Sequence, residues 1–279
     1  MCLKTARNLG WIVAIGAATA TPLTAQTTTP SFDPPRPGID SSRFLPDGGF
    51  AEGDGHRTLA AFPKNVGRGL VSVFRTNNVA PLLVGATLAG SSNFFDERVQ
   101  GAFGGKAPGF GSAGQSAGSA KVVIPFTVGL FAAGRASSSS RFRAATYDMA
   151  EALAVTSIYT AGFKYTVQRT RPDGSDRLSF PSGHTANTFA LASVANAHYG
   201  PKVGVPAFAV AAAIGLSRVE RGKHNVSDVL AGATLGFVVG RSVSHDNGVA
   251  PRGRSTRFAL TPSTDARGAG MGAGFSLSW

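Results

Sequence analysis

The chain has 279 residues and a formal net charge of +12, with 43% hydrophobic and 15% charged residues. This composition excludes an intrinsically disordered chain, because the apolar share is large enough to bury one substantial core. The positive charge is typical of proteins that meet an anionic partner, whether a nucleic acid, a membrane surface or a phosphorylated substrate.

The N-terminal segment has the pattern of an export signal. Lys4 and Arg7 form a positively charged start, residues 11–20 are apolar, and Leu23-Thr24-Ala25 suits cleavage. We therefore predict a signal peptide over residues 1–25 and a periplasmic protein of the bacterial cell envelope, soluble or membrane-associated. An uncleaved membrane anchor is the alternative, although the apolar run is shorter than the roughly 20 residues of a spanning helix. Residues 26–56, rich in proline, are predicted to form a tether.

Residues 57–247 are predicted to form one helical domain. Apolar periodicity between helix breakers predicts helices at 58–75, 79–92, 122–136, 142–169, 184–199, 203–219 and 225–243. No strand pattern interrupts them, so we expect an all-α helical bundle. The Gly-, Ser- and Ala-rich stretch 104–120 is predicted to be a flexible loop or lid. In the tail, 248–279, partial alternation at 257–264 and 271–279 predicts a β-hairpin.

The apolar helices raise the question of a membrane span. Their charge-free runs lie at 122–134, 152–163, 203–217 and 229–240. All are shorter than the roughly 20 residues that a span requires, which favours a bundle core. Membrane embedding stays open as the alternative.

Basic residues gather in two short stretches without interleaved aromatic residues: Lys164, Arg169, Arg171, Arg177, Arg218, Arg221 and Lys223. This arrangement favours a compact anion pocket over a nucleic-acid track. Lys164 and Arg171 are seven residues apart, so we expect them on one face at the end of the helix 142–169, which Pro172 would end. A lysine point charge and an arginine fork together suit a tetrahedral oxyanion.

The sequence Pro181-Ser182-Gly183-His184 precedes an apolar helix. Unpaired backbone N–H groups and the helix dipole favour an anion at such a helix start. Gly183 lets a ligand approach the backbone closely. Ser182 can cap the helix or donate its hydroxyl to a phosphate, and the capping role alone remains an alternative. His184 would lie at the mouth of the pocket.

His224 and Asp228 are four residues apart at the start of the helix 225–243. On one helix face, Asp228 could accept a hydrogen bond from one imidazole nitrogen and leave the other as a nucleophile. Such a pair is usually structural, but Arg218 lies just upstream and can supply positive charge.

Lys-x6-Arg-Pro, Pro-Ser-Gly-His and Ser-Arg-x5-His-x3-Asp follow one another in this order. The ordered triple resembles the type 2 phosphatidic acid phosphatase family, of the superfamily that includes vanadium haloperoxidases and bacterial nonspecific acid phosphatases. The resemblance covers about residues 120–243. One departure is that only eight residues separate Pro172 from Pro181, which shortens a loop without removing a motif position.

The resemblance implies a helical fold, a metal-free reaction and a role for each motif residue. His224 would form a phosphohistidine, Asp228 would orient His224, and His184 would protonate the leaving group. The implied phosphate ligands are Lys164, Arg171, Ser182, the Gly183 backbone and Arg218.

The remaining histidines and acidic pairs are given no functional role. No metal site is expected from the histidines, which lack partners at ligand spacing: His56, His198 and His245. Two acidic pairs are interpreted as solvated helix charges: Asp96 with Glu97, and Asp148 with Glu151.

We therefore expect hydrolysis of a phosphate monoester or diphosphate on a lipid or isoprenoid carrier at an anionic membrane, with no cofactor and no nucleic-acid partner. A small soluble phosphoester is the main alternative substrate. Vanadium-dependent halide oxidation is disfavoured by the short chain. A non-catalytic protein that binds phosphate or a lipid headgroup is disfavoured by the intact nucleophile, orienter and acid.

Overall fold

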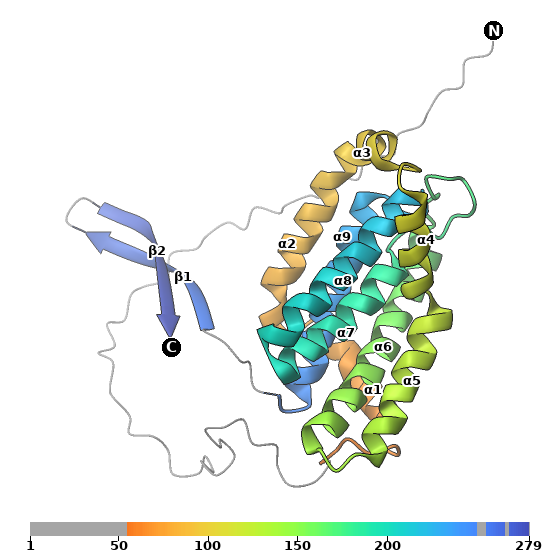
Figure 1. Cartoon of the computed structure of the whole chain (residues 1–279). Coiled ribbons are helices and arrows are strands. Elements are labelled where there is room, and N and C mark those ends of the chain that lie inside the picture. Colours follow the sequence, from red (N-terminus) through yellow and green to blue (C-terminus); the bar gives the residue numbers. More distant parts are fainter. Residues whose placement is uncertain (1–54, 250–254, 266–267, 279) are drawn as a thin grey trace. The chain divides into compact units, whose positions relative to one another are not determined.

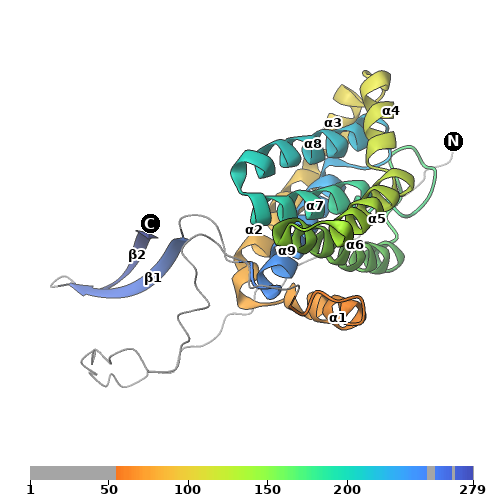
Figure 2. The same cartoon turned by 60° about the horizontal axis from the view of Figure 1, so that its bottom comes forward.

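The computed structural model describes residues 55–249, 255–265 and 268–278 (Figures 1 and 2). The predicted signal peptide and the predicted tether up to residue 54 lie outside the described residues.

The region 55–249 is helical. Its helices are α1 (Phe62–Ser72), α2 (Thr76–Ser92), α3 (Asp96–Phe103), α4 (Pro108–Ala117), α5 (Ala120–Ala136), α6 (Ser140–Val167), α7 (Gly183–Tyr199), α8 (Pro201–Glu220) and α9 (Val226–Asp246), with a 3-10 turn at Asn93–Phe95. The predicted all-α bundle is confirmed, and each predicted helix has a counterpart. Prolines occupy the first turn of α1, α4 and α8, where their missing N–H has no helical partner to lose.

The prediction of a loop at 104–120 was wrong, because most of this stretch forms α4. Two glycines of α4 pack directly on α8. A Cβ atom at Gly111 would lie 1.7 Å from Glu220 Oε2, and one at Gly114 would lie 2.2 Å from Ser217 Oγ. The helix is therefore stabilised by close contact with α8 that its low apolar content does not reveal.

The core lies where α9 packs against α6 and α7, with α2 also beside α9 (Figure 1). Small residues bring the backbones of α7 and α9 together. A Cβ atom at Gly236 would lie 2.1 Å from the carbonyl oxygen of Ala186. The apolar side chains that fill the core around this contact include Val155, Val194 and Val239, all fully buried. The tight contact holds the first turn of α7 against the middle of α9.

The acidic residues Asp148 and Glu151 of α6 are buried, so their interpretation as solvated charges was wrong. Asp148 pairs with Arg57 at 2.8 Å and with His198 Nε2 at 2.7 Å. Glu151 accepts a hydrogen bond from Asn247 at 2.9 Å. These contacts tie α6 to the end of α7 and to the residue that follows α9.

Two helices of the described region, α8 and α9, are long and apolar enough to cross a membrane, and α4 with α5 passes the same test as a pair bent by 42°. With 20 and 21 residues, α8 and α9 extend beyond the charge-free runs, so the argument from run length underestimated them. Large apolar side chains on several helices point outward, among them Leu83 (63% exposed), Phe126 (59%) and Val205 (63%).

The predicted hairpin is present in the tail. Strands β1 (Ser255–Asp265) and β2 (Gly268–Ser278) pair antiparallel, with Ser255 opposite Ser278 and Asp265 opposite Gly268. Both strands start earlier than the alternation pattern predicted, and β1 also ends one residue later.

Candidate active site

The three sequence motifs meet at one end of the bundle. The end of α6 brings Lys164, the start of α7 brings Ser182 to His184, and the end of α8 brings Arg218. The loop from α8 to α9 brings His224. The local backbone fixes these ends: α6 stops at Gln168, which has a left-handed φ of 49°, and α8 stops before Gly222, which has a φ of 62°.

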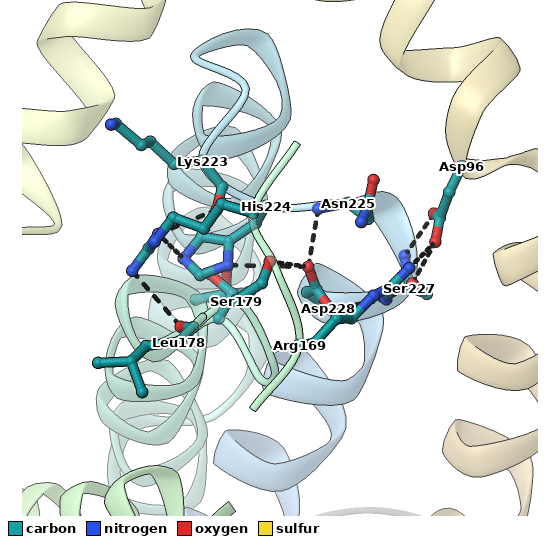
Figure 3. A network of polar contacts seen from close by, with 12 residues as sticks. Asp96, Arg169, Leu178, Ser179, Lys223, His224, Asn225, Ser227 and Asp228 are labelled. Atoms are coloured by element: carbon teal, nitrogen blue, oxygen red, sulfur yellow. Dashed lines mark hydrogen bonds and ion pairs between the residues drawn. The ribbon is translucent and has the colours of Figure 1, made fainter. Parts of the chain in front are cut away.

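His224 is 2% exposed and lies two residues before α9, not within the helix as the spacing argument assumed. Its Nε2 atom lies 3.3 Å from Arg171 Nη1, while its Nδ1 atom lies 3.9 Å from Asp228 Oδ2 (Figure 3). Burial, with the charges of Lys164, Arg171 and Arg218, holds the pKa of His224 well below its ordinary value of 6.5. The imidazole is therefore neutral, so one of its ring nitrogens carries a lone pair.

Three cations converge on this histidine. Arg171 lies in the loop after α6, not on the helix as predicted, and its Nη1 donates to the Lys223 carbonyl at 2.9 Å. Arg218 is 4% exposed, and its Nε atom has no hydrogen-bond partner among the described residues. Burial and the charge of Arg171 lower the pKa of Lys164 to about 8. Arg171 also pairs with Asp176 at 2.7 Å. The three cations still repel one another, which favours an anion between them.

The remaining cations of the predicted cluster lie elsewhere. Lys223 pairs with Asp173, and Arg221 lines a neighbouring cavity of about 310 Å³ beside Pro172, Glu220 and Gly222. Arg177 is exposed, and within the described part of the chain it donates only to the Gln168 carbonyl, at 3.4 Å. Arg169 pairs with Asp96 at 2.9 Å and with Asp228 at 2.8 Å.

The start of α7 presents Ser182, Gly183 and His184 to the same place. Ser182 is fully buried; its hydroxyl accepts a hydrogen bond from Thr185 at 2.9 Å and makes no cap to the helix backbone. The pKa of His184 is lowered to about 4, first by burial and then by the charge of Arg218. A hydrogen bond to the backbone of Gln115 in α4 acts in the opposite direction.

Asp228 is fully buried at the start of α9, and both of its carboxylate oxygens are occupied. Oδ1 accepts from Arg169 at 2.8 Å, and Oδ2 accepts from the Ser179 hydroxyl at 2.5 Å and from the Asn225 N–H at 2.9 Å (Figure 3). The 3.9 Å separation from His224 Nδ1 is too long for a hydrogen bond. The hydrogen bond expected between Asp228 and His224 is therefore not made.

Sequence reasoning missed several residues of this site. Asp96 is 4% exposed rather than solvated, and it accepts from the Ser227 N–H at 3.0 Å. Gln115 of α4 accepts from Arg218 Nη1 at 3.2 Å, within the stretch predicted to be a loop. Ser179 lies between two motifs. None of these residues stands at a spacing that links it to its partner, so no local pattern could have identified them.

The part of the chain that carries the site is similar to a known protein family. Residues 145–249 match the model of the PAP2 superfamily, which confirms the family resemblance found in the motifs. A curated relative, "Lipid A 1-phosphatase" of Porphyromonas gingivalis, is 45% identical over 80 residues, which are 28% of this chain and 18% of the relative. The match therefore spans less than a fifth of that relative's length.

Two solved structures are similar to parts of this chain. The crystal structure of Aquifex aeolicus LpxE is 24% identical, covers 49% of this chain and 84% of its own, and has a TM-score of 0.41. The PAP2-type phosphatidylglycerolphosphate phosphatase of Bacillus subtilis is 19% identical, covers 69% and 97%, and has a TM-score of 0.42.

Proposed function

We propose that this chain, which matches the PAP2 superfamily over residues 145–249, is a metal-independent phosphatase that acts through a phosphohistidine on His224. The substrate would be a phosphate monoester or diphosphate of a lipid or isoprenoid carrier. One observation carries the proposal: the buried imidazole of His224 faces Arg171, and Lys164 and Arg218 add two further positive charges beside it.

Phosphate binding would use the converging cations, the Ser182 hydroxyl and the backbone N–H groups at the start of α7. These donors supply the positive charge that many phosphatases obtain from metal ions. Arg218 Nε is a buried donor that a phosphate oxygen could satisfy. The same charges that lower the pKa of His224 would thus be neutralised in part by the substrate.

In the first chemical step, the lone pair of His224 Nε2 would attack phosphorus. A P–N bond forms while the P–O bond to the leaving group breaks. His184 would give its proton to the leaving oxygen. Without a bound anion the pKa of His184 is about 4. A bound phosphate dianion would raise this pKa, so His184 would take up a proton from solvent when the substrate binds, and that proton would leave with the alcohol or phosphate.

In the second step, His184, now neutral, would take a proton from water as the water oxygen attacks phosphorus. The P–N bond breaks, the electron pair returns to His224, and inorganic phosphate leaves. Asp228 would fix the loop that carries His224 through its bond to the Asn225 N–H.

A membrane-associated, lipid-linked substrate is supported by the span-length helices α8 and α9, the outward apolar side chains and the net charge of +12. Export to the periplasm remains part of the proposal. Membranes that are washed with high salt and alkaline carbonate should retain the protein, and detergent should release it. Release by salt alone would contradict embedding.

The reaction is tested with the full chain, purified in detergent and assayed with a chelator present. Phosphatidate, an isoprenyl diphosphate, lipid A and a soluble aryl phosphate are compared. We expect phosphate release that vanadate inhibits, and an acid-labile phosphoenzyme after a rapid quench. A strict requirement for a divalent metal would overturn the mechanism, and preference for the soluble ester would overturn the substrate class.

His224→Ala should remove both phosphate release and the phosphoenzyme, because no other imidazole stands in its place. His245→Ala is the matched control, since the His245 side chain is 54% exposed at the other end of α9. Full activity of His224→Ala would reassign the nucleophile.

A further inference from the structure

The helix α4 packs closely enough on its neighbours to reach two residues of the proposed site. A Cβ atom at Gly118 would lie 2.4 Å from Ile214 Cγ2 of α8 and 3.1 Å from His184 Cδ2 of α7. Gly114 packs on α8 in the same way, one turn earlier. Gln115 lies between these two glycines in the sequence and is partly buried. The missing side chains thus bring the main chain of α4 at Gln115 close to both helices.

The side chain of Gln115 holds Arg218 at one nitrogen. Its Oε1 atom accepts from Arg218 Nη1 at 3.2 Å, and no other acceptor of the described residues binds this guanidinium. Arg218 Nε is buried without a partner there. The Nε and Nη2 atoms form one edge of the planar guanidinium, and such an edge can bind two oxygens of a phosphate at once. Gln115 therefore fixes the guanidinium and leaves this edge to a ligand.

Arg171 has no such edge to offer. Its Nε atom donates to Asp176 at 2.7 Å, and its Nη1 and Nη2 atoms donate to the carbonyls of Lys223 at 2.9 Å and Leu178 at 3.4 Å. The partners also differ in charge, because an amide oxygen orients a cation without neutralising it, whereas a carboxylate does both. Of the two arginines, Arg218 is the one prepared for a bidentate contact with phosphate.

The main chain of Gln115 holds His184. Burial and the charge of Arg218 lower the pKa of His184, whereas its hydrogen bond to the Gln115 backbone raises this pKa. A bond that raises the pKa is one in which a ring N–H donates to the carbonyl oxygen, because a backbone N–H that donated to the ring would favour the neutral form. The other ring nitrogen is then left to exchange a proton with the leaving oxygen.

The charged groups that act on His184 are cations: Arg218 from α8, Arg171 from the loop after α6, and Lys164 from α6. All three disfavour a protonated ring. The Gln115 carbonyl opposes them, so it helps His184 to take up a proton when a phosphate binds.

We propose that Gln115 is a positioning residue for both halves of the reaction. Its side-chain oxygen directs the free edge of Arg218 to the phosphate, and its main-chain oxygen fixes which nitrogen of His184 serves the leaving group. This inference rests on the proposed phosphatase function. It gives α4 a part in the reaction, although none of its residues belongs to the three motifs.

The first test measures the dissociation constant of inorganic phosphate by calorimetry, with the full chain in detergent. Gln115→Glu keeps the shape of the side chain, but its carboxylate pairs with Arg218 and competes with phosphate. The dissociation constant and KM should therefore rise about tenfold, while the melting temperature does not fall. Ser116→Glu adds the same charge at the next, exposed position of α4 and is the control, which should leave both constants within about twofold of the parent.

Gln115→Leu removes the acceptor, so Arg218 loses its fixed direction and kcat/KM should fall about tenfold. In an Arg218→Met background the same change should have no further effect, because the two residues act as a unit. A purely structural role predicts a lower melting temperature for Gln115→Leu and parental phosphate affinity for Gln115→Glu. That outcome would overturn the side-chain half of the inference, and Gln115→Glu alone decides it if Gln115→Leu does not fold.

The second test concerns the main-chain oxygen. Gly118→Ala places a Cβ atom against Ile214 and His184, which moves this part of α4 away from the imidazole. The pKa of His184 should then fall, since the bond that raises it is weakened. The basic limb of phosphoenzyme formation, followed by rapid quench at saturating substrate, should move to lower pH by about one unit. Gly109→Ala, where the added Cβ atom meets open space, is the control and should leave the limb in place.

An unmoved limb in folded Gly118→Ala would contradict the main-chain half. If this variant does not fold, the imidazole nitrogen signals of His184 in the parent decide instead. One protonated and one unprotonated nitrogen are expected, and equal amounts of both tautomers would be the contrary result. Failure of the proposed function is distinguishable, because the parent would then form no phosphoenzyme on His224, whereas the phosphate affinities of the Gln115 variants do not depend on turnover.

Discussion

The helices α6, α7 and α9 carry a buried polar network at each end, and each network is built around one aspartate. At the end away from the motifs, Asp148 receives Arg57, His198 and Asn247, and Asn247 also donates to Glu151. At the other end, Asp228 receives Arg169, Ser179 and the Asn225 N–H. In both places one buried carboxylate ties together segments that are distant in sequence.

The two networks differ in charge balance. The Arg57 guanidinium binds Asp148 through two nitrogens and also donates to the Asn247 carbonyl, so its charge is matched. Beside His224, the charges of Lys164, Arg171 and Arg218 together lower the pKa of the same histidine. Among the described residues, Arg171 alone of these three has a carboxylate partner, Asp176 at 2.7 Å. A network that only stabilises the fold satisfies its charges internally, whereas a binding site leaves charge for a ligand.

The largest effect is expected from removing one cation at each end. Arg218→Met should lower kcat/KM by about a thousandfold, because a charged donor to the transferring phosphoryl group is lost. Its folded state should be no less stable than the parent, since repulsion from Arg171 disappears. Arg57→Met should cost roughly 3–5 kcal/mol of unfolding free energy, because Asp148 stays buried without its cation.

Urea unfolding and initial rates on the same preparations measure both quantities. The remaining folded Arg57→Met protein should turn over at the parental rate. The proposed difference between the two ends is contradicted if Arg218→Met loses as much unfolding free energy as Arg57→Met, since both ends would then have the same structural role.

Glu151 gives the next effect, on stability against pH. Burial raises its pKa from an ordinary 4.5 to about 7. The folded state therefore binds the proton more tightly than the unfolded state. The stabilising contribution is complete below pH 4.5 and is lost as the pH rises through about 7. Glu151→Gln should remove this loss and be more stable than the parent at pH 8 by roughly 2 kcal/mol.

The measurement is the difference in unfolding free energy between variant and parent at several pH values from 4 to 8. Glu97→Gln, at an exposed position of α3, is the control and should give a flat difference. A flat difference for Glu151→Gln would mean that the carboxyl group titrates alike in the folded and unfolded states.

The sequence alone gave correct predictions where interacting residues are close in the sequence or belong to the three motifs in their characteristic order. Apolar periodicity and prolines located the main helices, and motif spacing identified the residues that meet around His224. The helix α4 was missed because its stability comes from Gly111 and Gly114 against α8, a contact with no periodic apolar signature. Asp96 was misjudged because its partner Ser227 lies 131 residues away. Residue spacing can relate only residues that lie within one or two helical turns of each other.

The smallest effect is expected at Lys164. The titration of its ammonium group measures the uncompensated positive charge of the site directly. Burial and Arg171 lower its pKa to about 8, and only the charged ammonium binds phosphate. In kcat/KM, which reports the free enzyme, activity should therefore fall about tenfold per pH unit above pH 8. Bound phosphate stabilises the ammonium, so the corresponding limb of kcat should lie at higher pH.

Lys164→Arg should move the limb of kcat/KM to higher pH, because a guanidinium keeps its proton across this range. Lys223→Arg is the matched control, since Lys223 is paired with Asp173 outside the pocket and should leave the limb in place. If Lys223→Arg shifts the limb and Lys164→Arg does not, the cation that binds the phosphate is Lys223, on the loop before His224. The contrast in charge balance between the two ends would then rest on Arg218, because Arg171 is paired with Asp176 at 2.7 Å.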